Sequence, residues 1–261
     1  MLSYQHIYHA GNLADMHKHA LLAVALDYMT RKAKPMSYVE THAGRGLYRL
    51  DAMEAVKTGE AEAGLGRALG AGWFGADHPL TRVLEKVRAR EGAAAYPGSP
   101  VIAGELLRAG DAMHLAELHP QEGAALEAAM GRYGANVHRR DGYEMAQSIL
   151  PPTPRRGVVL IDPSYEIKAE YDRLPGIVAQ LHRKWNVGVI MLWYPILADA
   201  RHEKMVAALA ARDFPGPLHH EVRFPPAREG HGMIGSGMFV VNAPWGLSDE
   251  AQRLSSLFAK L

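Results

Sequence analysis

Seven short apolar segments with the pattern of β-strands alternate with helical patterns along this chain of 261 residues. The predicted strands are Met36–Thr41, Met113–Glu117, Asn136–Arg139, Val158–Asp162, Val187–Trp193, His219–Phe224 and Met238–Asn242. Strands that alternate with helices predict an α/β fold with a mostly parallel sheet and helices on both faces, because parallel neighbours need crossover connections. The last two strands are joined by a short connection, which makes them candidates for an antiparallel pair.

Helix signals fill the segments between these strands. Asn12 can cap a helix that runs to about Lys34, where Pro35 ends it. Further helices are predicted from Ser99, from Pro120, after Asp141, over Glu170–Lys184, over Ala198–Arg212 and at the C-terminus.

One region, residues 47–96, interrupts the alternation. It is rich in Ala and Gly, and its one clear amphipathic helix covers Leu80–Arg90. We therefore predict a main domain formed by residues 1–46 and 97–261, with a small helical insertion formed by residues 47–96.

Charge and composition exclude several classes of protein. The chain has 29 Lys and Arg against 28 Asp and Glu, so a nucleic-acid partner would need a local basic patch. The absence of Cys excludes disulfides, thiolate nucleophiles and Cys-ligated metals. The N-terminus lacks the pattern of a signal peptide, and the apolar stretches are too short to cross a bilayer, so a cytoplasmic protein without membrane contact is expected.

Acidic residues follow several of the predicted strands. Ligands of parallel sheets bind beyond the carboxyl ends of the strands, where Glu117 and Asp141 are expected. A carboxylate after the second strand can accept both ribose hydroxyl protons, and one after the third can accept from an adenine amine, which together describe an adenosine site. The alternative is that each acid only caps the following helix.

The turn after the first predicted strand contains two glycines, Gly44 and Gly46. This turn lacks the full G-x-G-x-x-G spacing of dinucleotide-binding proteins. It therefore supports adenosine binding only together with the acids, and the alternative is a tight turn that needs positive φ angles.

The fourth predicted strand delivers Asp162, Pro163, Ser164 and Tyr165 to one point. This tetrad resembles the catalytic D-P-P-Y motif of amino-methyltransferases that use S-adenosylmethionine, with Ser164 where many have Pro. An adenine amine is a poor nucleophile, so such a site must accept hydrogen bonds from both of its N–H groups as the methyl group approaches. Asp162 and the Pro163 carbonyl can accept them, and the Tyr165 ring can stack on a flipped base. The alternative is that the tetrad starts a helix and Tyr165 only packs.

A wider set of motifs resembles the RlmJ family of ribosomal RNA large-subunit adenine-N6 methyltransferases and covers nearly the whole chain. Residues 47–96 show the least similarity, apart from Thr58-Gly59-Glu60. The motifs are Met1-Leu2-Ser3-Tyr4, His6, His9-Ala10-Gly11-Asn12, Ala14-Asp15, Lys18-His19, Thr41-His42-Ala43-Gly44, Tyr96-Pro97-Gly98-Ser99-Pro100, Glu117-Leu118-His119-Pro120, Asp141-Gly142, Arg155-Arg156-Gly157, Trp193-Tyr194-Pro195, Gly232-Met233, Ser236-Gly237-Met238 and Asn242-Ala243-Pro244-Trp245.

This resemblance implies a Rossmann-like class I methyltransferase fold, S-adenosylmethionine as methyl donor, and methylation of the N6 amine of one adenine in 23S ribosomal RNA after base flipping. It implies Asp162 as proton acceptor, with Pro163 and Tyr165 completing the catalytic tetrad. Tyr4 and His6 are expected to contact the RNA together with Tyr165, and Lys18 is a cation that can meet the cofactor carboxylate. The other implied cofactor-binding residues are His19, His42, Ser99, Glu117, Asp141 and Gly142.

Other functions compatible with the tetrad are methylation of adenine in DNA or another RNA, or of a glutamine amide in a protein. A dehydrogenase would need a fuller glycine motif, and an RNA-binding protein without catalysis would not need Asp162. The RNA is expected to be naked or an early precursor, the protein a monomer, and no metal is predicted because the neighbouring His pairs lack the i, i+4 spacing of zinc ligands. Further candidates for RNA contact are Tyr8, Arg45, Arg49, Arg139, Arg140, Arg155 and Arg156, although a solvated surface position is the alternative for each.

Overall fold

The computed structural model describes residues 4–226 and 232–261; Met1, Leu2 and Ser3 of the N-terminal motif lie outside the described residues. One seven-stranded sheet has the order β5-β4-β1-β6-β7-β9-β8. Its strands are β1 Ser37–Glu40, β4 Ala112–Ala116, β5 Asn136–His138, β6 Gly157–Ile161, β7 Val189–Leu197, β8 Leu218–Arg223 and β9 Met233–Val241. Neighbouring strands from β5 to β7 pair in parallel, whereas β9 is antiparallel to both β7 and β8. The seven predicted strands and the antiparallel final pair are confirmed.

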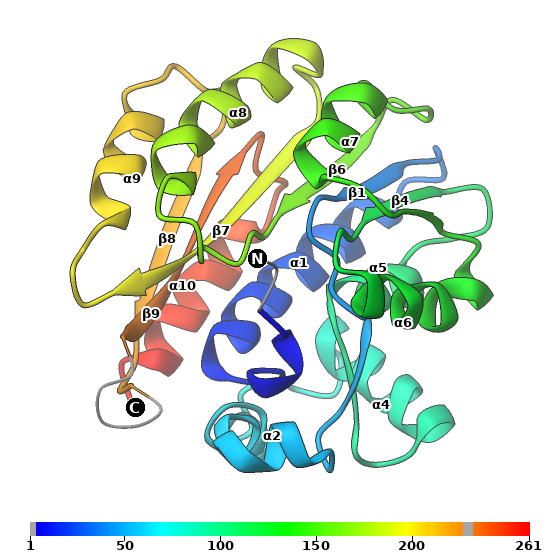
Figure 1. Cartoon of the computed structure of the whole chain (residues 1–261), viewed down its shortest axis with the longest axis vertical. Helices are drawn as coiled ribbons and strands as arrows, with labels where there is room; N and C mark the ends of the chain where they lie inside the picture. Colours follow the sequence, from blue (N-terminus) through cyan, green and yellow to red (C-terminus); the bar gives the residue numbers. More distant parts are fainter. Residues whose placement is uncertain (1–3, 227–231) are drawn as a thin grey trace.

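Helices cover both faces of this sheet (Figure 1). One face carries α7 Gly142–Ile149, α8 Glu170–Lys184 and α9 His202–Ala210, and the other carries α1 Leu13–Thr30, α5 Ser99–Leu106, α6 Pro120–Met130 and α10 Leu247–Phe258. Side chains of a strand alternate between the two faces, and accordingly Val158 and Leu160 pack on the α1 side while Val159 and Ile161 pack on the α8 side. Strand β6 is therefore buried on both faces, as expected for the centre of a parallel sheet.

The insertion contains more structure than its sequence predicts. A two-stranded antiparallel ribbon of β2 Leu47–Arg49 and β3 Ala95–Pro97 joins its two ends. Between them lie α2 Met53–Thr58, the π-helical turn η2 Glu62–Gly66, α3 Arg67–Gly70 and α4 Pro79–Glu91. Of these only α4 has a marked amphipathic pattern, which is why the other segments could not be predicted from periodicity.

The insertion packs directly on the start of α1. A Cβ atom at Gly64 would lie 2.2 Å from the carbonyl oxygen of Gly11, so only glycine permits this approach. The next residue, Leu65, donates its backbone N–H to the same carbonyl at 2.8 Å. The N-terminal segment is thus fixed between the insertion and the main sheet.

Several element boundaries differ from the sequence prediction. Helix α1 ends at Thr30 rather than near Lys34, and β7 and β9 each have nine residues. Ser99 does not cap α5; Gly98 occupies that position, and the Ser99 hydroxyl donates to a buried carboxylate instead. Among the described residues, no helix is long and apolar enough to cross a membrane.

Candidate active site

Asp162 lies directly after β6, and its carboxylate contacts a cation, Lys18, on helix α1. The Nζ atom of Lys18 on α1 donates to Asp162 Oδ2 at 2.6 Å and lies 3.2 Å from Asp15 Oδ1. Burial alone would lower the pKa of Lys18, but these two carboxylates hold it above its ordinary value. Lys18 is therefore a charged ammonium group between two acids.

Asp15 is the centre of the polar network on the first turns of α1. It is almost fully buried, and its Oδ2 atom accepts from the backbone N–H of Gly11 at 2.8 Å and contacts His6 Nε2 at 3.0 Å. Burial alone would raise the pKa of Asp15, but His6, Lys18 and His19 bring it well below its ordinary value. Sequence reasoning assigned Asp15 no role, although its i, i+3 and i, i+4 spacing to Lys18 and His19 places all three on one helix face.

The network continues from Asp15 to the N-terminal segment. His6 Nε2 carries the proton because it faces a carboxylate, which only accepts; His6 Nδ1 then accepts from the Tyr4 hydroxyl at 2.9 Å. The Tyr4 ring stacks on His9 at a centroid distance of 5.7 Å and remains 38% exposed. A continuous chain of hydrogen bonds and ion pairs, here called the relay, thus links Tyr4, His6, Asp15, Lys18 and Asp162. Tyr4 is its exposed end.

His19 and Lys18 are buried, whereas side chains that bind a cofactor at an open surface would be exposed. His19 is almost fully buried, its Nδ1 lies 2.8 Å from the Tyr96 hydroxyl, and burial lowers its pKa to about 3. Lys18 Nζ lies 5.2 Å from the centroid of the Trp193 ring, on the Asp162 side. Both residues lie inside the protein at the inner face of α1.

The turn after β1 meets the predicted ribose acid. Glu117, just after β4, accepts from the backbone N–H of Gly44 at 2.9 Å and from that of His119 at 2.7 Å. Gly44 has a φ angle of +60°, which favours glycine and orients this N–H group. Burial raises the pKa of Glu117 above its ordinary value. The acid is thus fixed against the turn rather than extended into solvent.

The turn after β5 approaches the same point. A Cβ atom at Gly142 would lie 1.8 Å from the carbonyl oxygen of Thr41, so glycine is required there. Asp141 Oδ1 accepts from the backbone N–H of Glu144 at 2.9 Å, which confirms the capping interpretation for that oxygen. His42 packs edge-on against Tyr143 at 4.9 Å, and burial lowers its pKa to about 4.

A buried acid that the sequence analysis missed lies beneath this turn. Glu40, the last residue of β1, is fully buried and accepts from the hydroxyls of Tyr38 and Ser99. Burial raises its pKa to about 8. Its only sequence signal is a carboxylate at the end of an otherwise apolar strand. The side chain of Ser99 is therefore bound to Glu40 inside the protein.

Tyr165 is packed inside the protein. Its φ angle is +58°, its side chain is 7% exposed, and its hydroxyl donates to the backbone carbonyl of Trp193 at 2.6 Å. Its ring lies 4.6 Å from that of Tyr171. Pro163 is also buried, whereas Ser164 is exposed. The Trp193 ring, which lies 5.2 Å from the Lys18 ammonium that binds Asp162, remains partly exposed.

Most of the arginines considered for RNA contact already have protein partners. Arg45 binds Glu122, Arg49 binds Asp51 and Arg139 binds Glu127, each through two nitrogens. Arg140 donates to the Ser148 hydroxyl, and Arg156 donates to the backbone carbonyls of Met29 and Lys34. These contacts spread over several elements and do not define one basic patch.

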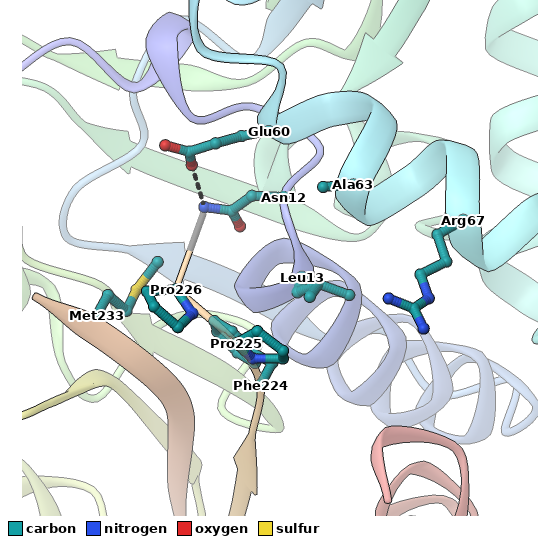
Figure 2. A pocket seen from close by; sticks show the side chains of 9 residues that line it. All are labelled: Asn12, Leu13, Glu60, Ala63, Arg67, Phe224, Pro225, Pro226 and Met233. Carbon is teal, nitrogen blue, oxygen red and sulfur yellow. Dashed lines mark hydrogen bonds between the residues drawn. The ribbon is translucent and has the colours of Figure 1, made fainter. Parts of the chain in front are cut away.

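A separate pocket of about 130 Å³ lies beside the site, between the start of α1, the insertion and the chain around β8 and β9 (Figure 2). Its wall is apolar, with Leu13, Phe224 and Met233, and Asn12 donates to Glu60 at 3.1 Å at its polar side. It contains none of the predicted cofactor or catalytic residues. Within residues 4–226 and 232–261, no group of three or more His, Asp or Glu side chains is arranged to hold a metal ion.

The fold and the strand-end residues together define the class of the protein. The seven strands of the sheet, numbered in chain order, lie in the order 3-2-1-4-5-7-6 with the last strand antiparallel, which is the arrangement of Rossmann-like class I methyltransferases. Acids or glycines follow β4, β5 and β6, at the edge where such sheets bind ligands.

The chain belongs to the family described as ribosomal RNA large subunit methyltransferase D, RlmJ, whose model matches residues 33–261. Ribosomal RNA large subunit methyltransferase J of Escherichia coli strain K12 is 36% identical over an alignment of 256 residues that covers 96% of this chain and 90% of that protein. The protein of the same name from Haemophilus influenzae is 34% identical over 267 residues, covering 100% of this chain and 94% of that protein. The predicted family resemblance is thereby confirmed.

A solved structure supports the fold. The crystal structure of a protein from Legionella pneumophila superimposes with a TM-score of 0.87 at 30% sequence identity, covering 97% of this chain and 93% of that chain. The predicted fold class is confirmed over the main sheet and its helices.

Proposed function

We propose that this protein transfers a methyl group from S-adenosylmethionine to the N6 amine of a specific adenine in 23S ribosomal RNA. The observation that carries the proposal is the buried contact of Asp162 with Lys18 at the end of β6, next to the Pro163 carbonyl and close to the Glu117 edge. The ion pair with Lys18 fixes the direction of the Asp162 carboxylate, which suits an acceptor of amine protons.

The residues at the β1, β4 and β5 ends fit the adenosine part of S-adenosylmethionine. Gly142 allows the turn after β5 to approach the Thr41 carbonyl closely. Glu117 is held by two backbone N–H groups, with lone pairs remaining for ribose hydroxyls. Asp141 and His42 complete the adenine side, and Ser99 acts through Glu40. When bound, this cofactor supplies an electrophilic methyl group on a sulfonium sulfur.

The chemistry at the amine then depends on Asp162 and Pro163. The Asp162 carboxylate and the Pro163 carbonyl accept hydrogen bonds from the two N–H groups of the amine, so that the nitrogen lone pair points toward the methyl carbon. The nitrogen–carbon bond would form as the sulfur–methyl bond of the donor breaks, with the electron pair leaving on sulfur. The nitrogen would become positively charged, and Asp162 would accept the proton that it loses. Lys18 holds the carboxylate throughout, which is a different role from binding the cofactor carboxylate. No covalent enzyme intermediate is needed.

RNA reaches this site from the side of the N-terminal segment in our proposal. Tyr4 is the exposed end of the relay, and its hydroxyl is bonded to His6, so both residues can contact the nucleotide that enters. Tyr165 supports the slot through the Trp193 carbonyl. We expect naked 23S RNA or an early precursor as substrate, a monomeric enzyme and a cytoplasmic location.

Parallel methylation of different substrates tests the proposal. The purified protein is incubated with S-adenosylmethionine and, separately, with naked 23S RNA, duplex DNA containing adenine, and a mixture of glutamine-containing peptides. Mass spectrometry of the digested products should detect N6-methyladenosine in the RNA only. Methylation of DNA or of peptide in preference to RNA would replace the proposed substrate, and an absence of transfer to every substrate would refute the proposal.

A further inference from the structure

Trp193 connects both sides of the proposed target slot. Its ring lies 5.2 Å from the ammonium of Lys18, and its backbone carbonyl accepts from the Tyr165 hydroxyl at 2.6 Å. The two rings of Tyr165 and Trp193 meet edge to face at 6.0 Å. Tyr165 is buried, whereas the Trp193 ring, next to the Lys18 ammonium that binds Asp162, is partly exposed.

The indole of Trp193 is anchored from the neighbouring strand. Its Nε1–H donates to the hydroxyl of Ser236 on β9 at 2.8 Å, and the same hydroxyl lies 2.8 Å from His17 Nδ1 on α1. Ser236 and His17 are both fully buried. Three elements that are distant in sequence, β7, β9 and α1, are therefore joined at one hydroxyl group.

The direction of these hydrogen bonds follows from their donors. An indole N–H only donates, so Ser236 Oγ accepts from Trp193, and its own proton goes to His17 Nδ1. His17 then carries its proton on Nε2, which donates to His220 Nδ1 at 2.9 Å. Burial lowers the pKa of His17 well below its ordinary value, so the ring is neutral and keeps Nδ1 as an acceptor.

The strand around Ser236 is built for close packing. A Cβ atom at Gly237 would lie 2.1 Å from the ring of Tyr194, and one at Gly235 would lie 2.4 Å from the carbonyl oxygen of Val222. Ser236 lies between these glycines, and its side chain points to the α1 side, where His17 lies. It thus supplies a hydroxyl at a position where strand packing itself requires none.

We propose that Ser236 and His17 are positioning residues that fix the Trp193 ring as the aromatic wall of the target-base slot and as the surface against which Lys18 is held. This inference rests on the proposed function, because the slot is that of the methylated base. An ammonium group bounded by a ring on one side and by two carboxylates on the other has one favourable position. Rotation of the indole would displace both the wall and Lys18, and small displacements at a reacting centre reduce turnover strongly.

A double-mutant cycle with Ser236→Ala and Trp193→Phe tests the proposal. Each single change is expected to lower kcat for RNA methylation by about 10-fold, with the KM for S-adenosylmethionine nearly unchanged. The double variant should be no slower than Trp193→Phe alone, because the hydroxyl acts only through the indole N–H. Ser256→Ala, an exposed serine on α10, is the matched control and should retain wild-type kcat.

Two further measurements separate positioning from a structural role. His17→Asn keeps an acceptor near the Nδ1 position and should restore most of the kcat that His17→Ala loses, whereas equal loss in both would contradict the proposal. The indole N–H signal of Trp193, assigned by its absence in Trp193→Phe, should exchange slowly with solvent in the wild-type protein and faster in Ser236→Ala.

Any of three further results would also overturn the inference: unchanged kcat in Ser236→Ala, additive effects in the double variant, or an indole signal that Ser236→Ala leaves unchanged. If Ser236→Ala fails to fold, His17→Asn and His17→Ala give the same decision. If the wild-type protein methylates no RNA, the proposed function fails, and the indole exchange still decides whether Ser236 anchors Trp193.

Discussion

The Nζ atom of Lys18 lies 2.6 Å from Asp162 Oδ2, although 144 residues separate the two in the sequence. Helix α1 supplies the cation and β6 supplies the acid, and the cation is 5% exposed against 13% for the carboxylate. Removal of one partner of a buried ion pair leaves the other as an uncompensated buried charge, so these two residues depend on each other.

Asp162→Ala should lower kcat by about 10²–10³-fold, because the amine loses a preorganised proton acceptor. Binding of S-adenosylmethionine, measured by titration calorimetry, should change little. Asp162→Asn is the control that keeps an acceptor oxygen without the charge. Wild-type turnover in Asp162→Ala would refute the assigned role.

Lys18→Met should also reduce kcat, by about 10-fold or more, because the Asp162 carboxylate loses the group that orients it. The change replaces a buried ammonium with an apolar side chain of similar length, and it leaves Asp15 without its ammonium partner. Steady-state kinetics with saturating S-adenosylmethionine measures the effect. A raised KM for the cofactor with normal kcat would instead return Lys18 to the role of cofactor ligand.

Glu117→Ala should weaken binding of S-adenosylmethionine by about 1–3 kcal/mol, because the ribose loses its hydrogen-bond acceptor and the N–H groups of Gly44 and His119 lose theirs. Titration calorimetry provides the affinity. Glu127→Ala, which removes an exposed acid paired with Arg139, is the control. Equal affinity in both variants would contradict the placement of the ribose at the β4 end.

Gly142→Ala should destabilise the protein by about 1–3 kcal/mol and weaken cofactor binding, because its Cβ atom would collide with the Thr41 carbonyl oxygen. Thermal unfolding and calorimetry measure the two effects. Gly176→Ala in α8, where a Cβ atom would meet nothing within 4 Å, should be neutral or slightly stabilising. A neutral Gly142→Ala would show that the two turns do not approach this closely.

The free energy of unfolding should decrease as the pH falls below about 6.5. Burial lowers the pKa of His19 to about 3 and that of His42 to about 4, from an ordinary value of 6.5. At pH values between the ordinary pKa of 6.5 and these lowered values, the unfolded chain therefore binds more protons than the folded chain. Each histidine contributes a slope of up to about 1.4 kcal/mol per pH unit to the free energy of unfolding. Urea unfolding between pH 7 and pH 4.5 measures the slope, which His19→Asn should reduce. An identical slope in that variant would contradict the prediction.

The sequence predicts the seven strands because their apolar character is local. It also predicts which residues follow the strands, since Glu117, Asp141 and Asp162 adjoin their strands in the chain. The contacts of these residues depend on tertiary packing, which periodicity does not encode. Lys18 is the clearest case: a cation near a helix start suggests an anionic ligand, but the fold places it between two acids of the protein itself.

Other features were not predictable for the same reason. Glu40 and Trp193 gain their importance from partners on distant elements, Ser99 and Ser236, and the insertion lacks the amphipathic pattern that would reveal its short helices. Tyr165 combines burial with a positive φ angle, which the sequence of a non-glycine residue does not suggest.

Strand β9 is the last strand along the chain but lies inside the sheet, between β7 and β8. During synthesis, the β7 edge therefore has no neighbour until residues 233–241 have left the ribosome, and β8 has no strand to join. Ser236 arrives with this same segment. A nascent chain that stops before β9 would have Asp162 and Lys18 but no anchor for the indole, so the proposed slot is complete only when β9 has joined the sheet.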